Sequence, residues 1–429
     1  MDQQRREFLA AAGALAGAAA LPGCATTGGG GTAGKVVVVG GGYGGATAAK
    51  YLRMWSNGTV GVTLIESRDS FVSCPLSNLV IGGSRTIADL TVSYDQLGRR
   101  WGVDVVRDMA TAVDVDKRVV TTAGGRTFGY DRLVLSPGIE FIFDAIPSYR
   151  ADPARAVGVV PHAWQAGPQT VLLRQQLEAM PDGGTFAIVI PVAPYRCPPG
   201  PYERVCQVAW YLKRSKPRSK ILVCDGNPDV TSKAALFKKA WAEEYRGLIE
   251  YRPNNVLVDV DLATRTAKFE TADDVKADVL NVVPPQRAGA IARAAGVITA
   301  NNRWCEVDFR SFESVRGKGV HVLGDAIQIA QAMPKSGHMA NNHGKIAAAA
   351  ILRMLAGQEP NPAPVLTNTC YSYITDKDVV HVASVHQWDA DKKTVLPVPN
   401  SGGLSPAMNE MEGTYANAWA RNIWADMLA

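Results

Sequence analysis

Residues 35–66 read KVVVVGGGYGGATAAKYLRMWSNGTVGVTLIE, and this stretch decides the fold. Its apolar run Val36–Val39 predicts a short strand that is buried on both faces. Residues 46–54 predict a helix, and a second apolar run over 60–65 ends at Glu66. A strand, a glycine-rich turn, a helix and a second strand that ends in an acid form the βαβ unit that binds a dinucleotide. The sequence therefore predicts a Rossmann-type start to the folded chain.

Three glycines in that turn, Gly40, Gly42 and Gly45, have the spacing G-x-G-x-x-G. The first allows a tight turn, the second lets a pyrophosphate approach the backbone, and the third lets the helix pack on the strand. The pyrophosphate would lie at the helix N-terminus, where free N–H groups and the helix dipole favour an anion. Glu66 is placed to accept a hydrogen bond from a ribose hydroxyl. This acid disfavours NADP, because a 2′-phosphate would meet a carboxylate.

The chain before about residue 33 has the pattern of an export signal. Arg5-Arg6 is followed by Phe8-Leu9 and an Ala/Gly/Leu run that ends at Leu21, which resembles a twin-arginine signal. We therefore expect a periplasmic protein that is exported after it has folded. The residues up to Cys24 also resemble a lipoprotein cleavage box, so lipid anchoring at Cys24 is the alternative to a free protein. The apolar run is too short and too poor in large side chains to span a membrane.

Composition limits the functional classes. The chain has 429 residues, 47% of them hydrophobic and 20% charged, with a formal net charge of +5. This is ordinary globular composition with room for two or three domains. The positive charge forms no basic stripe, so we expect no nucleic-acid partner. No C-x-x-C occurs and no His/Cys cluster has the spacing of metal ligands, so we expect no metal site.

A second βαβ unit is predicted to begin with a strand over 185–190, followed by a helix over 202–212. The connection between them, 191–201, is rich in proline, which lacks an N–H and fixes φ, so it cannot cradle a pyrophosphate. This unit therefore lacks a nicotinamide site. Cys197 lies just before the helix N-terminus, where a thiolate is stabilised. Glu203, in the first helical turn, is either a proton acceptor or an acid that only favours the helix dipole.

Two further signatures favour FAD over NAD. Residues 130–138 predict a buried strand that ends in Ser-Pro-Gly at Gly138, a variant of the Ala-Thr-Gly turn that closes over FAD in two-domain flavoprotein reductases. Residues 319–326 predict a strand that ends in Gly-Asp-Ala, with Asp325 placed to contact the ribityl chain. Lys335, which we include among the cofactor-binding residues, precedes an alanine-rich helix. The N-terminus of that helix would face the flavin and stabilise negative charge on the reduced ring.

The remaining cysteines divide into two groups. Cys74 lies in the segment that returns across the cofactor in flavin-binding domains. From the residues alone, it is either a group that reaches the flavin ring or a buried structural thiol. Cys206, Cys224 and Cys305 fit no redox pattern, and we expect them to be buried thiols.

Taken together, these motifs resemble the flavoprotein subunit of flavocytochrome c sulfide dehydrogenase over nearly the whole chain after the leader. The resemblance is carried by GGGYGGATAAKYL, Cys74-Pro-Leu-Ser-Asn, YRCPPGPYE, PPQRAG, MPKSG and NTCYS. YRCPPGPYE and NTCYS are far more specific than the glycine turn. The resemblance agrees with an α/β fold of two Rossmann-like FAD/NAD(P)-binding-type domains, the second without a nucleotide site, and a small C-terminal α+β domain.

Three cysteine roles are implied by the resemblance. Cys74 matches the cysteine that binds FAD covalently through the 8α-methyl group, and Cys197 and Cys370 match the pair that forms a redox-active disulfide beside the flavin. HS⁻ would attack one sulfur of that disulfide, leaving a persulfide and a thiolate, and two electrons would reduce FAD. The acceptor in this family is a c-type haem subunit. Because this chain has no C-x-x-C-H, the haem is expected on a separate partner.

We predict five segments: a signal and linker over 1–33, the first part of an FAD-binding domain over 34–155, a central Rossmann-like domain over 156–285, the second part of the FAD-binding domain over 286–357, and a C-terminal flavin-capping domain over 358–429.

Three alternative functions remain open. A sulfide:quinone oxidoreductase shares the fold and the cysteine chemistry, but the export signal and the lack of any apolar segment that could span a bilayer disfavour it. The proline-rich loop disfavours a NAD(P)H-dependent flavin disulfide reductase, and an exported electron carrier without catalysis would follow if the disulfide does not form.

Overall fold

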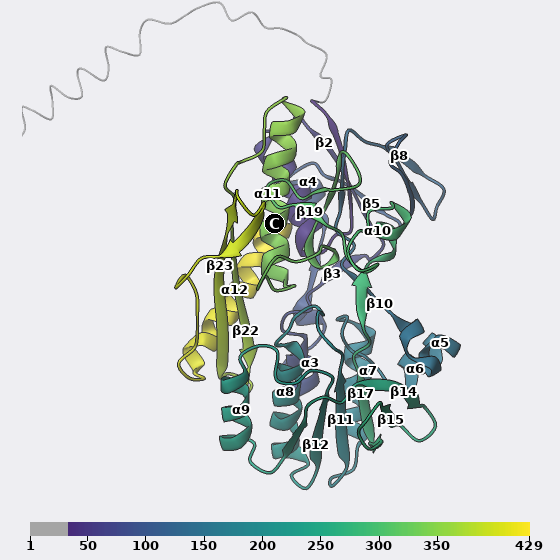
Figure 1. Cartoon of the computed structure of the whole chain (residues 1–429), viewed down its shortest axis with the longest axis vertical. Coiled ribbons are helices and arrows are strands. Elements are labelled where there is room, and N and C mark those ends of the chain that lie inside the picture. The colour runs from purple at the N-terminus through teal and green to yellow at the C-terminus, as the bar shows by residue number, and fades with distance from the viewer. Residues whose placement is uncertain (1–32) are drawn as a thin grey trace, which may run out of the picture. The chain divides into compact units, whose positions relative to one another are not determined.

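The computed structural model describes residues 33–429. The predicted twin-arginine signal and the lipid-anchoring alternative at Cys24 fall in residues 1–32, outside the described residues. The described chain is an α/β fold in which a mixed seven-stranded sheet and a parallel four-stranded sheet pack against helices, with a further antiparallel sheet at the C-terminal end (Figure 1). The predicted fold class is confirmed, because both Rossmann-like units are present.

The first unit is built on a seven-stranded sheet with the order β19-β20-β21-β9-β1-β2-β5. Strand β1 lies between β2 and β9, parallel to both, and its valines are buried. A central parallel strand is covered on both faces, so it favours β-branched side chains on both. The elements of this unit are β1 (Lys35–Val39), α2 (Tyr43–Trp55), β2 (Gly61–Glu66), β3 (Ser70–Val72), α3 (Ser77–Gly82), η1 (Ala88–Leu90), β4 (Thr91–Ser93), α4 (Asp95–Arg99), β5 (Asp104–Arg107), β6 (Ala110–Asp114), β7 (Val119–Thr122), β8 (Thr127–Gly129), β9 (Arg132–Leu135), β10 (Ile139–Phe141), β18 (Gln286–Ala288), α10 (Ala290–Ala294), β19 (Val307–Asp308), β20 (Glu313–Ser314), β21 (Val320–Val322), η3 (Gly324–Ala326) and α11 (Gly337–Leu355).

Helix α2 begins at Tyr43, earlier than the predicted residue 46. Gly42 serves as its N-cap with extended backbone, at φ −72° and ψ −168°. The helix therefore starts directly at the second glycine of the turn, and its free N–H groups lie beside the predicted pyrophosphate position.

The second unit has a four-stranded sheet with the order β13-β12-β11-β17, in which all pairs are parallel. Helix α8 covers it, and Val205, Val208 and Leu212, which share one face of that helix, are buried. The elements are η2 (Phe143–Ala145), α5 (Pro147–Ala151), α6 (Pro153–Val159), α7 (Pro168–Ala179), β11 (Thr185–Ile190), α8 (Gly200–Ser215), β12 (Lys220–Asp225), α9 (Ala234–Glu243), β13 (Ile249–Arg252), β14 (Leu257–Asp261), β15 (Thr266–Phe269), β16 (Val275–Lys276) and β17 (Val279–Val282).

The apolar runs over 103–113 and 117–122 predict strands of one small β-meander, and for the first part of this segment that prediction is wrong. Strand β5 joins the first sheet in parallel with β2, where Thr63 pairs with Asp104. A separate antiparallel meander is formed by β6, β7 and β8. The chain turns at Asp108, so the apolar run is divided between two sheets. Local composition does not encode which sheet a short strand joins.

The C-terminal segment forms an antiparallel sheet and a long helix: β22 (Val365–Tyr373), β23 (Val379–Asp389), β24 (Thr394–Pro397), β25 (Gly403–Leu404) and α12 (Glu410–Leu428). Strand β22 contacts α11 of the first unit and α8 of the second, and β23 contacts α12 (Figure 1). Trp424 of α12 donates from Nε1 to the Tyr43 hydroxyl at 3.2 Å. The Trp-rich end is therefore a helix packed onto the fold.

Within residues 33–429, no helix combines the length and the apolar composition that crossing a bilayer requires. Cys206, Cys224 and Cys305 are buried free thiols, as predicted. In the same range, no three His, Cys, Asp or Glu side chains gather as metal ligands would.

Candidate active site

Each glycine of the turn after β1 has a different environment. Gly40 has a φ of +95°, and a Cβ there would lie 2.3 Å from the backbone oxygen of Ser136. A Cβ on Gly45 would lie 1.9 Å from the backbone oxygen of Gly40, so a side chain there would push α2 away from β1. A Cβ on Gly42 would meet no protein atom within 4 Å. The fold itself therefore requires Gly40 and Gly45, whereas the space at Gly42 is open to a ligand.

The acid at the end of β2 lies beside this turn. Glu66 is buried, and its carboxylate accepts hydrogen bonds from the N–H of Gly41 at 2.6 Å and from the N–H of Arg68 at 2.9 Å. These bonds fix the carboxylate next to the N-terminus of α2, which no side chain caps. The arrangement fits an adenosine ribose and a pyrophosphate, and the binding role of Glu66 stays a prediction.

The turns that follow β1, β9 and β21 meet at the carboxyl edge of the first sheet. A Cβ on Gly44 would lie 2.9 Å from Ser136 Oγ and 3.3 Å from Leu323 Cβ. Gly138 has a φ of +64°, and its Cβ position faces open space. Ligands of open α/β sheets bind at this edge.

Asp325, which follows β21, has a carboxylate oxygen without a donor. Its Oδ1 is buried and has no hydrogen-bond partner among the described residues, and burial raises the pKa of the carboxyl. A buried acceptor without a donor is costly, so this atom requires a donor that the chain does not supply. A ribityl hydroxyl has that chemistry. Together with the open space at Gly42, this orphaned oxygen makes the residues present a fit for FAD.

Lys335 supports the turn that carries Asp325. Its side chain is 2% exposed, and Nζ donates to the backbone oxygens of Asp325 at 2.8 Å and Ile327 at 2.6 Å. The ammonium also lies 3.6 Å from the centroid of the Trp304 ring. Burial lowers the pKa of Lys335 to about 7. The backbone oxygen of Lys335 accepts the N–H of Cys197 at 2.8 Å, so this residue links the nucleotide edge to the cysteine loop.

The predicted redox pair comes together from two units. Cys197 lies in the loop before α8 with a φ of +55°, and its N–H donates to the backbone oxygen of Lys335. Cys370 lies on β22, and its sulfur lies 3.5 Å from Nδ2 of Asn368, whose Oδ1 accepts from the hydroxyl of Ser336, next to Lys335, at 2.7 Å. Both are partly buried free thiols in the structure, so the disulfide stays a prediction. Burial raises the pKa of Cys197, and the neighbouring Cys370 raises it further by a smaller amount. This direction is opposite to that expected from its place before a helix N-terminus, because desolvation of the thiolate outweighs the helix dipole.

Cys74 belongs to the same cluster. It lies between β3 and α3, and its Sγ accepts a hydrogen bond from Nη2 of Arg196 at 3.3 Å. Arg196 directly precedes Cys197, so the loop that carries one redox cysteine also contacts the predicted flavin attachment site. Cys74 is a free thiol in the structure, and covalent attachment stays a prediction.

Glu203 lies in a buried polar network. Its carboxylate accepts from Asn78 Nδ2 at 2.7 Å and from the N–H of Tyr373 at 2.9 Å. Burial raises the pKa of Glu203. The acid therefore bonds to α3 and to β22 and does more than balance a helix dipole. Its role in proton transfer stays a prediction.

Arg204, next in the chain, is 1% exposed. It donates to Asn78 Oδ1 at 3.1 Å, to Asn281 Oδ1 at 2.9 Å and to the backbone oxygen of His162 at 2.9 Å. Burial lowers the pKa of Arg204 to about 9, so it remains charged at neutral pH. This guanidinium holds α8, α3 and the loop before α7 together.

Replacing Arg204 with methionine should lower the free energy of unfolding by about 3 kcal/mol or more, because several buried acceptors would lose their donor. Arg214→Met, on the exposed part of the same helix, is the matched control and should cost less than about 1 kcal/mol. Urea denaturation followed by circular dichroism measures both. Equal losses in the two variants would contradict the buried-network interpretation.

The corresponding acid of the second unit is used inside the protein. Asp225 ends β12, and its carboxylate accepts from the hydroxyl of Tyr202 at 2.7 Å, the hydroxyl of Tyr251 at 3.0 Å and the N–H of Asn227 at 2.9 Å. It is fully buried. An acid occupied in this way is not available to a nicotinamide ribose, which agrees with the proline-rich loop beside it.

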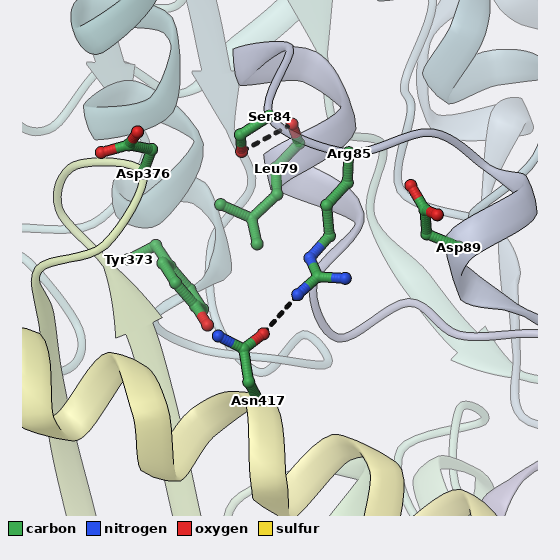
Figure 2. Close-up of a pocket in the computed structure, with 7 residues that line it drawn as sticks. All are labelled: Leu79, Ser84, Arg85, Asp89, Tyr373, Asp376 and Asn417. Atoms are coloured by element: carbon green, nitrogen blue, oxygen red, sulfur yellow. Dashed lines mark hydrogen bonds between the residues drawn. The ribbon is translucent and has the colours of Figure 1, made fainter.

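A surface pocket of about 350 Å³ shares Tyr373 with the Glu203 network. Figure 2 shows Arg85 reaching across it to Asn417 of α12, where the guanidinium donates to the amide oxygen. The pocket is lined by Leu79, Ser84, Arg85, Asp89, Tyr373, Asp376 and Asn417. None of the predicted site residues is among them.

Sequence analysis missed three polar residues of the cysteine site. Asn78 and Arg204 lie within or directly after motifs that carry the family resemblance, so a signal was present. Lys233 carries no local signal. It comes close to Cys370 only because the central unit packs against β22.

Comparisons with known proteins agree with this geometry. The family model described as "Sulfide dehydrogenase [flavocytochrome c] flavoprotein chain, central" matches residues 170–284. The model "Flavocytochrome c sulphide dehydrogenase, flavin-binding" matches residues 362–428, and "Pyridine nucleotide-disulphide oxidoreductase" matches residues 34–153.

Curated relatives fall into two groups. The flavoprotein chain of sulfide dehydrogenase [flavocytochrome c] from Chlorobaculum thiosulfatiphilum is 56% identical over 38 residues, which are 9% of this chain and 77% of that sequence. The mitochondrial sulfide:quinone oxidoreductase of Dictyostelium discoideum is 24% identical over 295 residues, 66% of this chain and 63% of that protein. The chain thus spans less than two thirds of that longer relative.

Among solved structures, the sulfide:quinone oxidoreductase of Aquifex aeolicus matches with a TM-score of 0.74 at 21% identity, covering 92% of this chain and 91% of that one. At this identity the match establishes the fold. The family models support bound FAD.

Proposed function

Because this chain belongs to the flavocytochrome c sulfide dehydrogenase flavoprotein family, we propose that it oxidises sulfide with bound FAD and delivers the electrons to a separate c-type cytochrome subunit in the periplasm. The single observation that carries the proposal is that the segments of Cys197 and Cys370 both bond to Lys335-Ser336, beside the turn of Asp325. Export by the twin-arginine signal and covalent attachment of FAD at Cys74 are parts of it.

FAD would be held by the open turn at Gly42, by Glu66 and by the orphaned oxygen of Asp325. When bound, it supplies a two-electron acceptor that can release its electrons singly. Lys335 fixes the Asp325 turn, and its backbone oxygen fixes the loop of Cys197. Lys335 therefore fixes the position of Cys197 relative to the cofactor site.

The sulfur chemistry uses a Cys197–Cys370 disulfide. HS⁻ attacks one sulfur, the S–S bond breaks, and a persulfide forms on one cysteine while the other leaves as a thiolate. A second HS⁻ removes the outer sulfur as HSS⁻ and leaves both cysteines reduced. Two HS⁻ thus become HSS⁻, one proton and two electrons, and the electrons leave the dithiol as the disulfide re-forms.

Glu203 is the proposed proton acceptor. Burial raises its pKa, and a base acts only when deprotonated, so reduction by sulfide should fall as the pH drops through that raised pKa. Glu203→Gln should slow reduction about 100-fold or more and remove this acid limb. Stopped-flow absorbance at constant HS⁻ concentration measures both effects, with the exposed Glu178→Gln as control. An unchanged limb in Glu203→Gln would assign the titration to another group.

Two observations bear on the electron acceptor. The matching family descriptions name a flavocytochrome c, which supports a cytochrome partner. The sulfide:quinone oxidoreductases of Dictyostelium and Aquifex favour quinone as the second candidate. None of the helices within residues 33–429 is long and apolar enough to cross a bilayer.

An anaerobic sulfide titration of the purified holoprotein tests the proposal. Sulfide should bleach the visible flavin band, and oxidised cytochrome c should restore it. Restoration by a quinone analogue alone would support the second candidate. Absence of bleaching by sulfide would refute the sulfide chemistry. Bleaching of the flavin band by NADH would instead support a NAD(P)H-dependent flavin disulfide reductase.

A further inference from the structure

Lys233 is a buried lysine that the sulfur chemistry described above does not use. It directly precedes α9, where its backbone has a φ of +56°, and its side chain is 5% exposed. Left-handed backbone at a non-glycine residue is strained, and burial of an ammonium is costly as well. A residue with both features requires strong compensating contacts.

Those contacts all lie on the C-terminal sheet. Nζ donates to the backbone oxygen of Cys370 at 2.9 Å, to Ser372 Oγ at 2.7 Å and to the backbone oxygen of Val380 at 3.5 Å. Lys233 belongs to the central unit, which also carries Cys197, whereas its three acceptors belong to β22 and β23. One ammonium therefore joins the strand of Cys370 to the unit of Cys197.

The charge of Lys233 also acts on the cysteines. Burial lowers the pKa of Lys233 to about 8, so it is mostly protonated at neutral pH. Its charge opposes the effect of burial on Cys370 and on Cys197. The other charged or titratable groups that act on these three side chains are Glu203 of α8, Glu412 of α12 and Arg196 of the cysteine loop, and neutral Asn368 and Ser336 bond to Cys370.

We propose that Lys233 is a positioning residue that holds Cys370 opposite Cys197 and stabilises negative charge on the Cys370 sulfur. The inference rests on the proposed function, which it deepens. Attack by HS⁻ brings one negative charge into a partly buried pair that already faces the carboxyl of Glu203. Whichever sulfur is attacked, Cys370 then carries a persulfide or a thiolate. A fixed ammonium lowers the cost of that charge.

Lys233→Met removes the charge at similar length, and Lys238→Met, an exposed lysine of the same helix paired with Asp229, is the matched control. In the holoprotein, alkylation of reduced Cys370 by iodoacetamide at neutral pH, read by peptide mass spectrometry, should slow about tenfold in Lys233→Met. Lys238→Met should leave this rate unchanged.

Rescue separates charge from packing. Lys233→Arg should restore the rate and the pH profile of Cys370 alkylation, and Lys233→Gln, which keeps hydrogen-bond donors without charge, should not. If Lys233→Met does not fold, the same comparison is made with Lys233→Gln. Alkylation of Cys370 at the wild-type rate in the neutral variant would overturn the proposal. If the oxidised wild-type protein lacks the disulfide, the proposed sulfide chemistry fails, whereas Cys370 alkylation still tests Lys233.

Discussion

A Cys197→Ser protein should retain FAD but lose flavin bleaching by sulfide, with the rate of reduction falling by at least about a thousandfold. The serine cannot form the disulfide that HS⁻ attacks, and no other cysteine of the described chain is placed to replace it. Cys206, Cys224 and Cys305 are fully buried. Cys74 is the predicted flavin attachment site. Anaerobic stopped-flow absorbance after mixing with sulfide measures the loss.

A thiol count on the same protein gives an independent result. Under denaturing conditions without reductant, Cys197→Ser should show one more reactive thiol than the wild type, because Cys370 loses its partner. Cys224→Ala, a change on β12 away from the site, should lose one thiol and keep the sulfide reaction. If Cys197→Ser shows no additional thiol, the disulfide assignment is wrong, even if activity is lost.

The second large effect is expected at the glycine turn, where two similar substitutions should fail in different ways. Gly45→Ala should destabilise the protein by about 3 kcal/mol or more and yield little soluble material, because its Cβ would lie 1.9 Å from the backbone oxygen of Gly40. Neither atom is the end of a flexible side chain, so helix α2 must move away from β1.

Gly42→Ala should fold, because its Cβ meets no protein atom within 4 Å. The new methyl group would instead occupy the space open to the pyrophosphate, so the purified protein should contain little FAD. Thermal melting and the ratio of visible to ultraviolet absorbance measure the two properties separately. A Gly42→Ala protein with full flavin content would mean that the pyrophosphate does not bind at this turn.

Much of the architecture could be predicted because its signals are local. The valines of β1, the glycine spacing and the acid at the end of β2 lie within one short stretch, and strand β11 was predicted with its observed bounds. Errors arose where the choice was not local. Strand β5 joins the first sheet, and α2 starts at Tyr43 because Gly42 can serve as its N-cap.

The candidate site was less accessible to local reasoning. The family resemblance pointed to Cys74, Cys197 and Cys370, but their surroundings come from distant segments. A place before a helix N-terminus suggests a stabilised thiolate at Cys197, whereas burial raises its pKa. Sequence patterns report helix ends, but they do not report how completely the neighbouring segments exclude water.

Amino-acid sequence alone predicted the first βαβ unit and the proline-filled second unit, because glycine, proline and apolar periodicity act through the local backbone. It also named Cys74, Cys197 and Cys370 as the candidate reactive residues, and their roles stay predictions. Tertiary structure decided that Lys233 reaches Cys370, that Glu203 bonds to Asn78 and Tyr373, and that Asp225 is occupied by tyrosines. These contacts join residues far apart in the chain. They form only when whole units pack, and burial then fixes both the hydrogen-bond partners and the cost of each charge.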